Sequence, residues 1–357
     1  MTGLKMIASK EEDTPSHSKI SRADAADRIA VMLEQESTAY KCRDYLIGEE
    51  ITCSMTSPSL TGLNQPHENK PQQKGCIDRA CREKMTRWCY QVTDFCKFRR
   101  EAVAISTSFL DRFLSSSSPR AQKALCSKKE FQLAAMTTFY IAVKLFEPMI
   151  IDAPLLATIS QGCYDENDID DMEKDILSDL GWRMNGPIVH DFISHFLVFL
   201  PMSANIHDGE VETVLLDIAR YQAECSTMDY DISMMSQSDV ALAALLNSME
   251  GIDEEDFPAL SRFEFLLKIS DETGLNPFSY DVNVARARLL ELFKKNLGYE
   301  LPQIANLTPV ISSKKEFVIQ MPKRLKSTST GSTSTSSPVS VTKHPYQRRN
   351  SQTAKCA

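Results

Sequence analysis

Apolar residues recur along most of this chain every three or four positions, the spacing that places them on one face of an α-helix. The first stripe predicts a helix of about twenty residues and consists of Ile77, Cys81, Met85, Trp88, Val92 and Phe95. A second helix is expected over Arg100–Leu114 and a third over Lys128–Phe146. The third is apolar on every side, which is typical of a helix buried at the centre of a bundle.

Two more helices are expected before the pattern starts again. A short one covers Pro154–Ser160, and a longer one covers Asp165–Leu180, with acidic residues in its first turns and Gly181 as its cap. Five further helical segments follow at Ile188–Phe199, Val211–Glu224, Val240–Met249, Ala259–Ile269 and Val282–Leu297. The middle one of these five is again rich in alanine and apolar throughout. The sequence therefore predicts an all-α fold of two tandem five-helix bundles, each wrapped around a central helix.

The segments outside these bundles are polar, apart from a short amphipathic helix expected at Ala23–Leu33. Residues 1–20, the stretch Thr56–Gly75 and the Ser/Thr-rich stretch Ser327–Ser337 contain too few apolar groups to offset the entropy of ordering. We therefore expect disordered N- and C-terminal tails. The predicted domains are an N-terminal region 1–76, a first bundle 77–183, a second bundle 184–300 and a basic tail 301–357.

Charge is unevenly distributed along the 357 residues, whose net charge is −8. From Glu316 to the C-terminus there are no further acidic residues but seven Lys or Arg, so the rest of the chain is near −15. An acidic body repels phosphate backbones, and we expect no direct nucleic-acid binding by the folded part.

Neither a membrane segment nor a metal or cofactor site is expected. The N-terminus has no apolar stretch long enough for a signal peptide, and the longest apolar run is interrupted by His195, so we expect a soluble intracellular protein. The closest cysteines are spaced at five, eight and seven residues, which does not gather four ligands around one metal. They are Cys76, Cys81, Cys89 and Cys96.

Two charged residues interrupt faces that should be apolar. Lys144 lies near the C-terminal end of the all-apolar helix, where exposed carbonyl groups favour a cation. Glu173 lies within an apolar stripe formed by Ile169, Met172, Ile176, Leu177 and Leu180. The carboxylate needs either an internal Lys or Arg or donors supplied by another protein. We expect both side chains to lie at the surface, set among apolar neighbours and left for a partner's groups instead of each other's.

Five phrases of the sequence, in this order, resemble the cyclin family, specifically its two-box, D-type members. They are "CREKMTRWCYQV", "FLDRFLSS", "FQLAAMTTFYIAVKLFEP", "DDMEKDILSDLGW" and "PIVHDFISHFLVFLP". The resemblance covers about residues 77–300. It implies a regulatory subunit that binds and activates a cyclin-dependent serine/threonine protein kinase during the cell cycle and that is not itself an enzyme.

The resemblance also implies roles for individual residues. Lys144 and Glu173 would contact the kinase near its mobile C-helix, with Leu145 and Trp182 as apolar surroundings. Within the first bundle, Arg82 and Asp111 would form an internal ion pair between the first two helices, and Leu133 fills the fifth characteristic position, in the core.

A second family surface, which docks substrates and inhibitors bearing an Arg-x-Leu motif, maps onto Cys81, Lys84, Met85, Trp88, Gln91 and Gln132. Trp88 and Gln132 suit that role, whereas Lys84 replaces an aliphatic residue and Gln91 replaces an acid. The alternative is a helix that packs on the chain's own N-terminal segment. The Leu-x-Cys-x-Glu motif of many D-type members is not found, which leaves a link to retinoblastoma-like proteins open.

The tails carry candidate regulatory sites. Thr14, Ser57, Thr308 and Ser337 each precede a proline, the pattern that proline-directed kinases prefer, and the last two lie in the basic tail. The short basic run Pro322–Lys326 resembles a nuclear import signal, so we expect the protein in nucleus and cytoplasm.

The alternative functions are a transcription or adaptor protein with the same fold, and an enzyme. General transcription factors and pocket proteins share the same helical repeat, but the acidic body argues against DNA binding. An enzyme has little support, since His190, Asp191 and His195 lie beside no nucleophile motif, and twelve glycines form no phosphate-binding loop.

Overall fold

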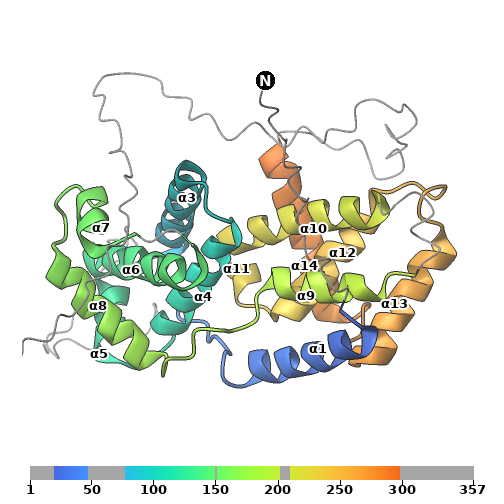
Figure 1. The fold of residues 1–357 in the computed structure, drawn as a ribbon, viewed down its shortest axis with the longest axis horizontal. Coiled ribbons are helices and arrows are strands. Elements are labelled where there is room, and N and C mark those ends of the chain that lie inside the picture. Colours follow the sequence, from blue (N-terminus) through green and yellow to red (C-terminus); the bar gives the residue numbers. More distant parts are fainter. Residues whose placement is uncertain (1–19, 47–76, 149–150, 202–209, 298–357) are drawn as a thin grey trace, which may run out of the picture.

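The computed structural model describes residues 20–46, 77–148, 151–201 and 210–297, and every regular element in these ranges is a helix. The helices form two units that lie side by side (Figure 1). The predicted all-α fold of two successive bundles is confirmed. The predicted disordered tails and the linker Thr56–Gly75 lie outside the described residues.

The first unit surrounds one buried helix. Its members are α3 (Arg79–Cys96), α4 (Glu101–Leu114), α5 (Pro119–Cys126), α6 (Lys128–Phe146), α7 (Ala153–Ile159) and α8 (Glu166–Asp179). Every residue of α6 from Leu133 to Val143 is buried, because α3, α4, α5 and α8 all pack around it. Small side chains such as Ala134 and Ala142 allow the neighbouring helices to approach closely.

The second unit repeats this arrangement. It contains α9 (Val189–Phe196) with the 3₁₀ turn η1 (Leu197–Phe199), α10 (Glu210–Met228), α11 (Tyr230–Ser233), α12 (Gln237–Glu250), α13 (Ala259–Thr273) and α14 (Tyr280–Leu297). The central helix is α12, in which every residue from Val240 to Met249 is buried against α9, α10 and α14. The sequence period therefore identified the central helix of each unit correctly.

The N-terminal helix α1 (Arg22–Ser37) belongs to the second unit in space although it precedes the first in sequence (Figure 1). Ala25 and Ile29 are fully buried in the core of the second unit. At the end of α1, the Glu36 carboxylate accepts hydrogen bonds from the backbone N–H and hydroxyl of Ser238, so it caps the first turn of α12. Residues 38–46, called the strap below, then run across the junction between the units.

Two short helices, α5 and α11, add to the five expected in each unit. Ser118 is the N-cap of helix α5: its hydroxyl accepts from the N–H of Ala121, and Pro119 is the first residue of the helix. This serine–proline pair marks the start of a new helix, a few residues after α4 ends at Leu114. Among the described residues, none of the helices is long and apolar enough to cross a membrane.

Candidate functional site

Lys144 and Glu173 lie together on the surface of the first unit. Lys144 is in the last turn of α6 and Glu173 is on the neighbouring helix α8, and the Nζ–Oε1 distance between them is 2.9 Å. The Lys144 side chain is 46% exposed, whereas the Glu173 side chain is 14% exposed. The hydrogen bond to Glu173 raises the pKa of Lys144 above its ordinary value. The expectation that each head would be left without the other is therefore wrong for the chain by itself, although both do reach the surface.

The apolar surroundings of this pair are exposed. Leu145 follows Lys144 and is 52% exposed, and Trp182, just beyond α8, is 73% exposed. Large apolar side chains that reach solvent beside a charged pair resemble the core of a protein interface, where aromatic anchors surround a few polar groups. Below, Lys144, Glu173, Leu145 and Trp182 are called the contact patch.

Trp182 is held outward by the way α8 ends. The N–H of Gly181 donates to the carbonyl of Ser178 and the N–H of Trp182 donates to the carbonyl of Leu177, the two bonds of a Schellman cap. Gly181 has φ +57° and Trp182 has φ +60°. A left-handed conformation is costly for a bulky side chain such as tryptophan, so Trp182 carries backbone strain at this surface position.

Arg82 and Asp111 form a buried ion pair between α3 and α4. Arg82 Nε and Nη2 donate to the two carboxylate oxygens of Asp111 at 2.8 Å and 2.7 Å, and the Arg82 side chain is 1% exposed. Burial alone would lower the pKa of Arg82, but the charge and hydrogen bonds of Asp111 raise it above its ordinary value. The guanidinium therefore stays charged inside the protein. Leu133 is buried in the core of the same unit.

This ion pair also joins the first unit to the second unit and to the strap. Arg82 Nη1 donates to the carbonyl oxygen of Thr227 at the end of α10, at 2.9 Å. The hydroxyl of Tyr45, in the strap, donates to Asp111 Oδ1 at 2.7 Å, and the Tyr45 N–H donates to the hydroxyl of Tyr230. The sequence gives no signal for Tyr45, Thr227 or Tyr230, because these contacts join residues far apart in the chain.

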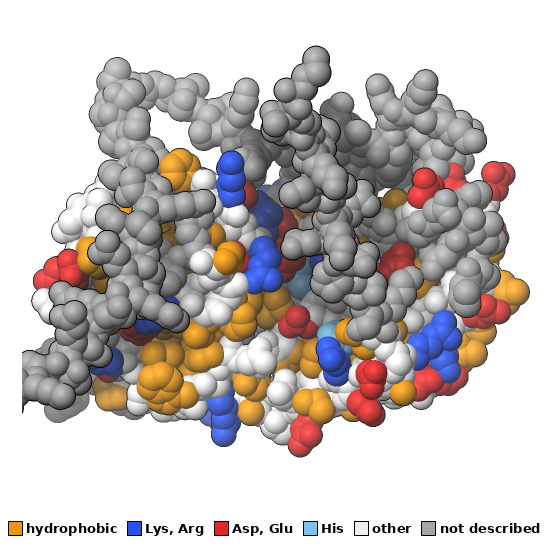
Figure 2. Space-filling view, viewed as in Figure 1, with side chains coloured by type: hydrophobic (Ala, Val, Ile, Leu, Met, Phe, Trp, Pro, Cys, Tyr) orange, Lys and Arg blue, Asp and Glu red, His pale blue; other side chains and the backbone are white. Residues whose placement is uncertain are grey.

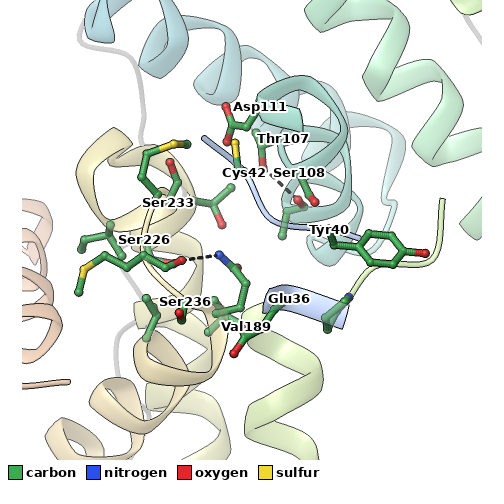
Figure 3. A pocket seen from close by; sticks show the side chains of 18 of the residues that line it. Glu36, Tyr40, Cys42, Thr107, Ser108, Asp111, Val189, Ser226, Ser233 and Ser236 are labelled. Carbon is green, nitrogen blue, oxygen red and sulfur yellow. Dashed lines mark hydrogen bonds between the residues drawn. The ribbon is translucent and has the colours of Figure 1, made fainter. Parts of the chain in front are cut away.

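A cavity of about 220 Å³ lies at the same junction, between the strap, α4 and the second unit (Figure 3). Cys42 lines it together with hydroxyl groups from both units. Burial and the nearby Asp111 charge raise the pKa of the Cys42 thiol to about 12. A thiol that stays protonated at neutral pH is a poor nucleophile, so this cavity gives no support to an enzymatic function.

The residues singled out for an enzymatic function are used in the structure of the second unit. The Asp191 carboxylate accepts from the N–H of Ile188 at the start of α9, and His195 Nδ1 lies 2.7 Å from the carbonyl oxygen of Asp191. His190 is buried, and burial lowers its pKa to about 4. No group of three or more metal-ligating side chains occurs within the described ranges.

The residues of the expected Arg-x-Leu docking surface lie on α3 and at the start of α6. Lys84, Gln91 and Gln132 are exposed, whereas Cys81, Met85 and Trp88 are partly buried against the first core. The Trp88 ring packs edge-on against Phe139, at 6.0 Å between ring centroids. The surface thus exists as a polar rim around a partly covered tryptophan, and its docking role stays a prediction.

Comparison with known families gives two matches in succession. The "Cyclin, N-terminal domain" model matches residues 50–185, and the "Cyclin, C-terminal domain" model matches residues 187–275. The chain belongs to the cyclin family. The boundary between the two matches falls in the connection between α8 and α9, where the helical pattern starts to repeat.

Individual relatives are more distant. This cyclin is 24% identical to the G1/S-specific cyclin-D1 of Danio rerio over 207 residues, which span 58% of the chain and 67% of the relative. It is 26% identical to the G2/mitotic-specific cyclin-B of Patella vulgata, over 48% of the chain and 38% of the relative. It is 30% identical to the G2/mitotic-specific cyclin-B1 of Oryzias latipes, over 46% of the chain and 37% of the relative. The chain therefore spans well under half of the two B-type relatives.

A viral cyclin from herpesvirus saimiri superposes with a TM-score of 0.46 at 19% identity, covering 62% of this cyclin and 89% of the viral chain. A chain of the CAK complex from Chaetomium thermophilum bound to ATP-γ-S superposes with a TM-score of 0.43 at 14% identity, covering 81% of this cyclin and 82% of that chain.

The candidate regulatory sites of the tails lie outside the described residues. They are the basic run Pro322–Lys326 and the four candidate phosphorylation sites Thr14, Ser57, Thr308 and Ser337.

Proposed function

We propose that this cyclin is a D-type-like regulatory subunit that binds and activates a cyclin-dependent serine/threonine protein kinase and has no catalytic activity of its own. The observation that supports the proposal is the contact patch, in which an ion pair at the surface is flanked by the exposed side chains of Leu145 and Trp182. D-type relatives are among the matches, and the resemblance assigns a kinase-binding role to the same four positions.

The pairing of Lys144 with Glu173 is compatible with kinase binding. An ammonium group has three N–H donors, and one of them is used by Glu173 Oε1. Tyr140 also lies against the ammonium group, with its ring centroid 5.3 Å from Nζ. A remaining donor would bind a partner's carbonyl or carboxylate group, while Glu173 holds the lysine in one place before the kinase arrives. Less side-chain entropy is then lost on binding, so a pre-formed pair favours affinity. Burial of Leu145 and Trp182 supplies the apolar part of the interface.

Activation would follow from rigid binding to one state of the kinase. Phosphoryl transfer requires the Lys–Glu ion pair inside the kinase, and this pair depends on the position of the kinase C-helix. A helical surface that binds only the inward position shifts the kinase population toward the active form. If the inactive form of the free kinase dominates by about 99 to 1, reversing that ratio requires about 5.5 kcal/mol of differential binding.

The test is the affinity of the full chain for the cyclin-dependent kinase that co-purifies with it. Lys144→Ala and Glu173→Ala should each weaken binding by about 2–5 kcal/mol, since each leaves a charge unpaired at the centre of the interface. The matched control is Lys174→Ala. Lys174 is the next residue on α8 and pairs with Asp171, but both side chains are well exposed, so its removal should leave affinity unchanged. Wild-type affinity in both Lys144→Ala and Glu173→Ala would refute the proposed contact.

A further inference from the structure

Helix α13 has a second apolar face, outside the core, whose large side chains are exposed. Its inner face places Phe265, Leu266 and Ile269 in the core of the second unit. On the outer face, Leu260 is 69% exposed and Phe263 is 56% exposed, and Leu267 lies on the same side. The spacing of these three residues, three and then four, is the heptad seam by which a helix contacts another chain segment.

This outer face lies away from the contact patch. Leu145 and Trp182 belong to the first unit, on α6 and just beyond α8, whereas α13 is on the far side of the second unit (Figure 1). Figure 2 shows apolar and acidic side chains at that end of the molecule, with basic side chains beside them. Kinase binding at the contact patch therefore leaves the outer face of α13 unexplained.

Acidic residues surround the exposed stripe. At 100° per residue, Glu264 and Asp271 fall on the flank of the stripe formed by Leu260 and Leu267. The loop before α13 adds the run Asp253–Asp256, all four of which are acidic. Between Glu250 and Glu272 there are eight acidic residues and two basic ones. The segment that covers this face should therefore combine apolar side chains with positive charge.

One stretch of the same chain has this composition. Residues 314–326 read KKEFVIQMPKRLK, with five Lys or Arg and one Glu. The apolar residues are at their centre, with Phe317, Val318 and Ile319 in succession, and basic pairs lie on both sides. The stretch is thus complementary to the outer face of α13 in both charge and polarity.

We propose that residues 314–326 bind to the outer face of α13 in the same molecule. Sixteen residues, 298–313, connect the end of α14 to this segment. Fully extended, they reach roughly 55 Å, more than twice the length of about 22 Å expected for α13. A tether of this size gives an effective concentration on the order of millimolar, so a weak intrinsic affinity is enough for occupancy. Binding here would also cover the basic run Pro322–Lys326.

Photo-crosslinking of the full chain tests the proposal. With p-benzoylphenylalanine in place of Phe317, irradiation should join this position to α13 within one chain, as identified by mass spectrometry of the peptides. Leu260→Ser combined with Phe263→Ser should lower the yield about tenfold or more, since both apolar contacts are lost. Glu264→Lys combined with Asp271→Lys should also lower it, because the face would then repel the basic segment.

Phe95→Ser is the matched control, because Phe95 on α3 is 56% exposed, the same fraction as Phe263. Its crosslinking yield should equal that of wild type. Because the substituted side chains are exposed, each variant should keep the wild-type fold, and its helix content and melting temperature check this. The proposal is overturned by crosslinks that miss α13, by crosslinks that join two chains, or by an undiminished yield in the Leu260→Ser, Phe263→Ser variant. These outcomes do not depend on kinase binding.

Discussion

Replacing Arg82 by alanine should destabilise this cyclin far more than removal of any exposed arginine. The substitution removes three hydrogen bonds, two to Asp111 and one to the carbonyl oxygen of Thr227. Asp111 is 4% exposed and would keep the hydroxyl of Tyr45 but no positive charge. Breaking a buried pair in this way costs about 3–5 kcal/mol, because the remaining charge is neither solvated nor compensated.

Urea denaturation followed by circular dichroism measures this effect as the change in the free energy of unfolding. Arg79→Ala is the control on the same helix, since Arg79 pairs with Asp231 while both side chains are about half exposed. That substitution should cost about 1 kcal/mol at most. Arg82→Met combined with Asp111→Leu should cost less than Arg82→Ala, since no charge is stranded. Equal losses in Arg82→Ala and Arg79→Ala would refute the assignment of a stabilising buried pair.

Three further perturbations give distinct results. In Trp182→Gly the free energy of unfolding should be unchanged or higher by up to about 1 kcal/mol, because glycine tolerates φ +60°. The same substitution should weaken kinase binding, because it removes an exposed apolar side chain of the contact patch. Reduced stability with full affinity would contradict this. Gly186→Ala should cost about 1–3 kcal/mol, because the added Cβ would lie 2.3 Å from Tyr40 Cδ1, and Tyr40→Ala should restore part of that loss in a urea melt. Burial raises the pKa of Glu36 above its ordinary value of 4.5, despite the hydrogen bonds from Ser238. Its contribution to stability is therefore complete below pH 4.5 and is lost as the pH rises through the folded pKa. Glu36→Gln should therefore gain stability relative to wild type as the pH rises above 4.5; a stability difference that does not change with pH would contradict this.

The central helices could be predicted from sequence because each is apolar on all sides, a pattern that only a buried position satisfies. The predicted range Lys128–Phe146 equals α6, and Val240–Met249 is the buried part of α12. Helix α5 could not be predicted from periodicity, since Ala121 and Ala124 are its only buried residues and give too weak a stripe. Its start signal at Ser118 and Pro119 was present.

The contact patch could be located on two helix faces but not assembled. Glu173 was expected on the burying face of α8, and it is largely buried there. Whether Lys144 reaches it depends on how α6 and α8 pack, which the sequence of neither helix specifies. The same limit applies to the junction, where Arg82 contacts the carbonyl oxygen of Thr227 across 145 residues of chain.

Helix α1 shows a different limit of sequence reasoning. The amphipathic pattern predicted a helix at Ala23–Leu33, and α1 forms there with additional residues at its C-terminal end. Its partner could not be inferred, because Ala25 and Ile29 complement the core of the second unit and not that of the neighbouring first unit. Only the folded chain brings Glu36 to the start of α12.

The most direct test of the central claim measures the rate at which the co-purified kinase phosphorylates a substrate protein. The kinase is first separated from this cyclin, and increasing amounts of the cyclin are then added back. We expect saturable activation by wild type and by Lys174→Ala. Lys144→Ala should require roughly thirty- to several-thousand-fold more protein for the same rate, the equivalent of about 2–5 kcal/mol. A kinase that stays inactive with wild type, or that responds equally to Lys144→Ala, would contradict the account.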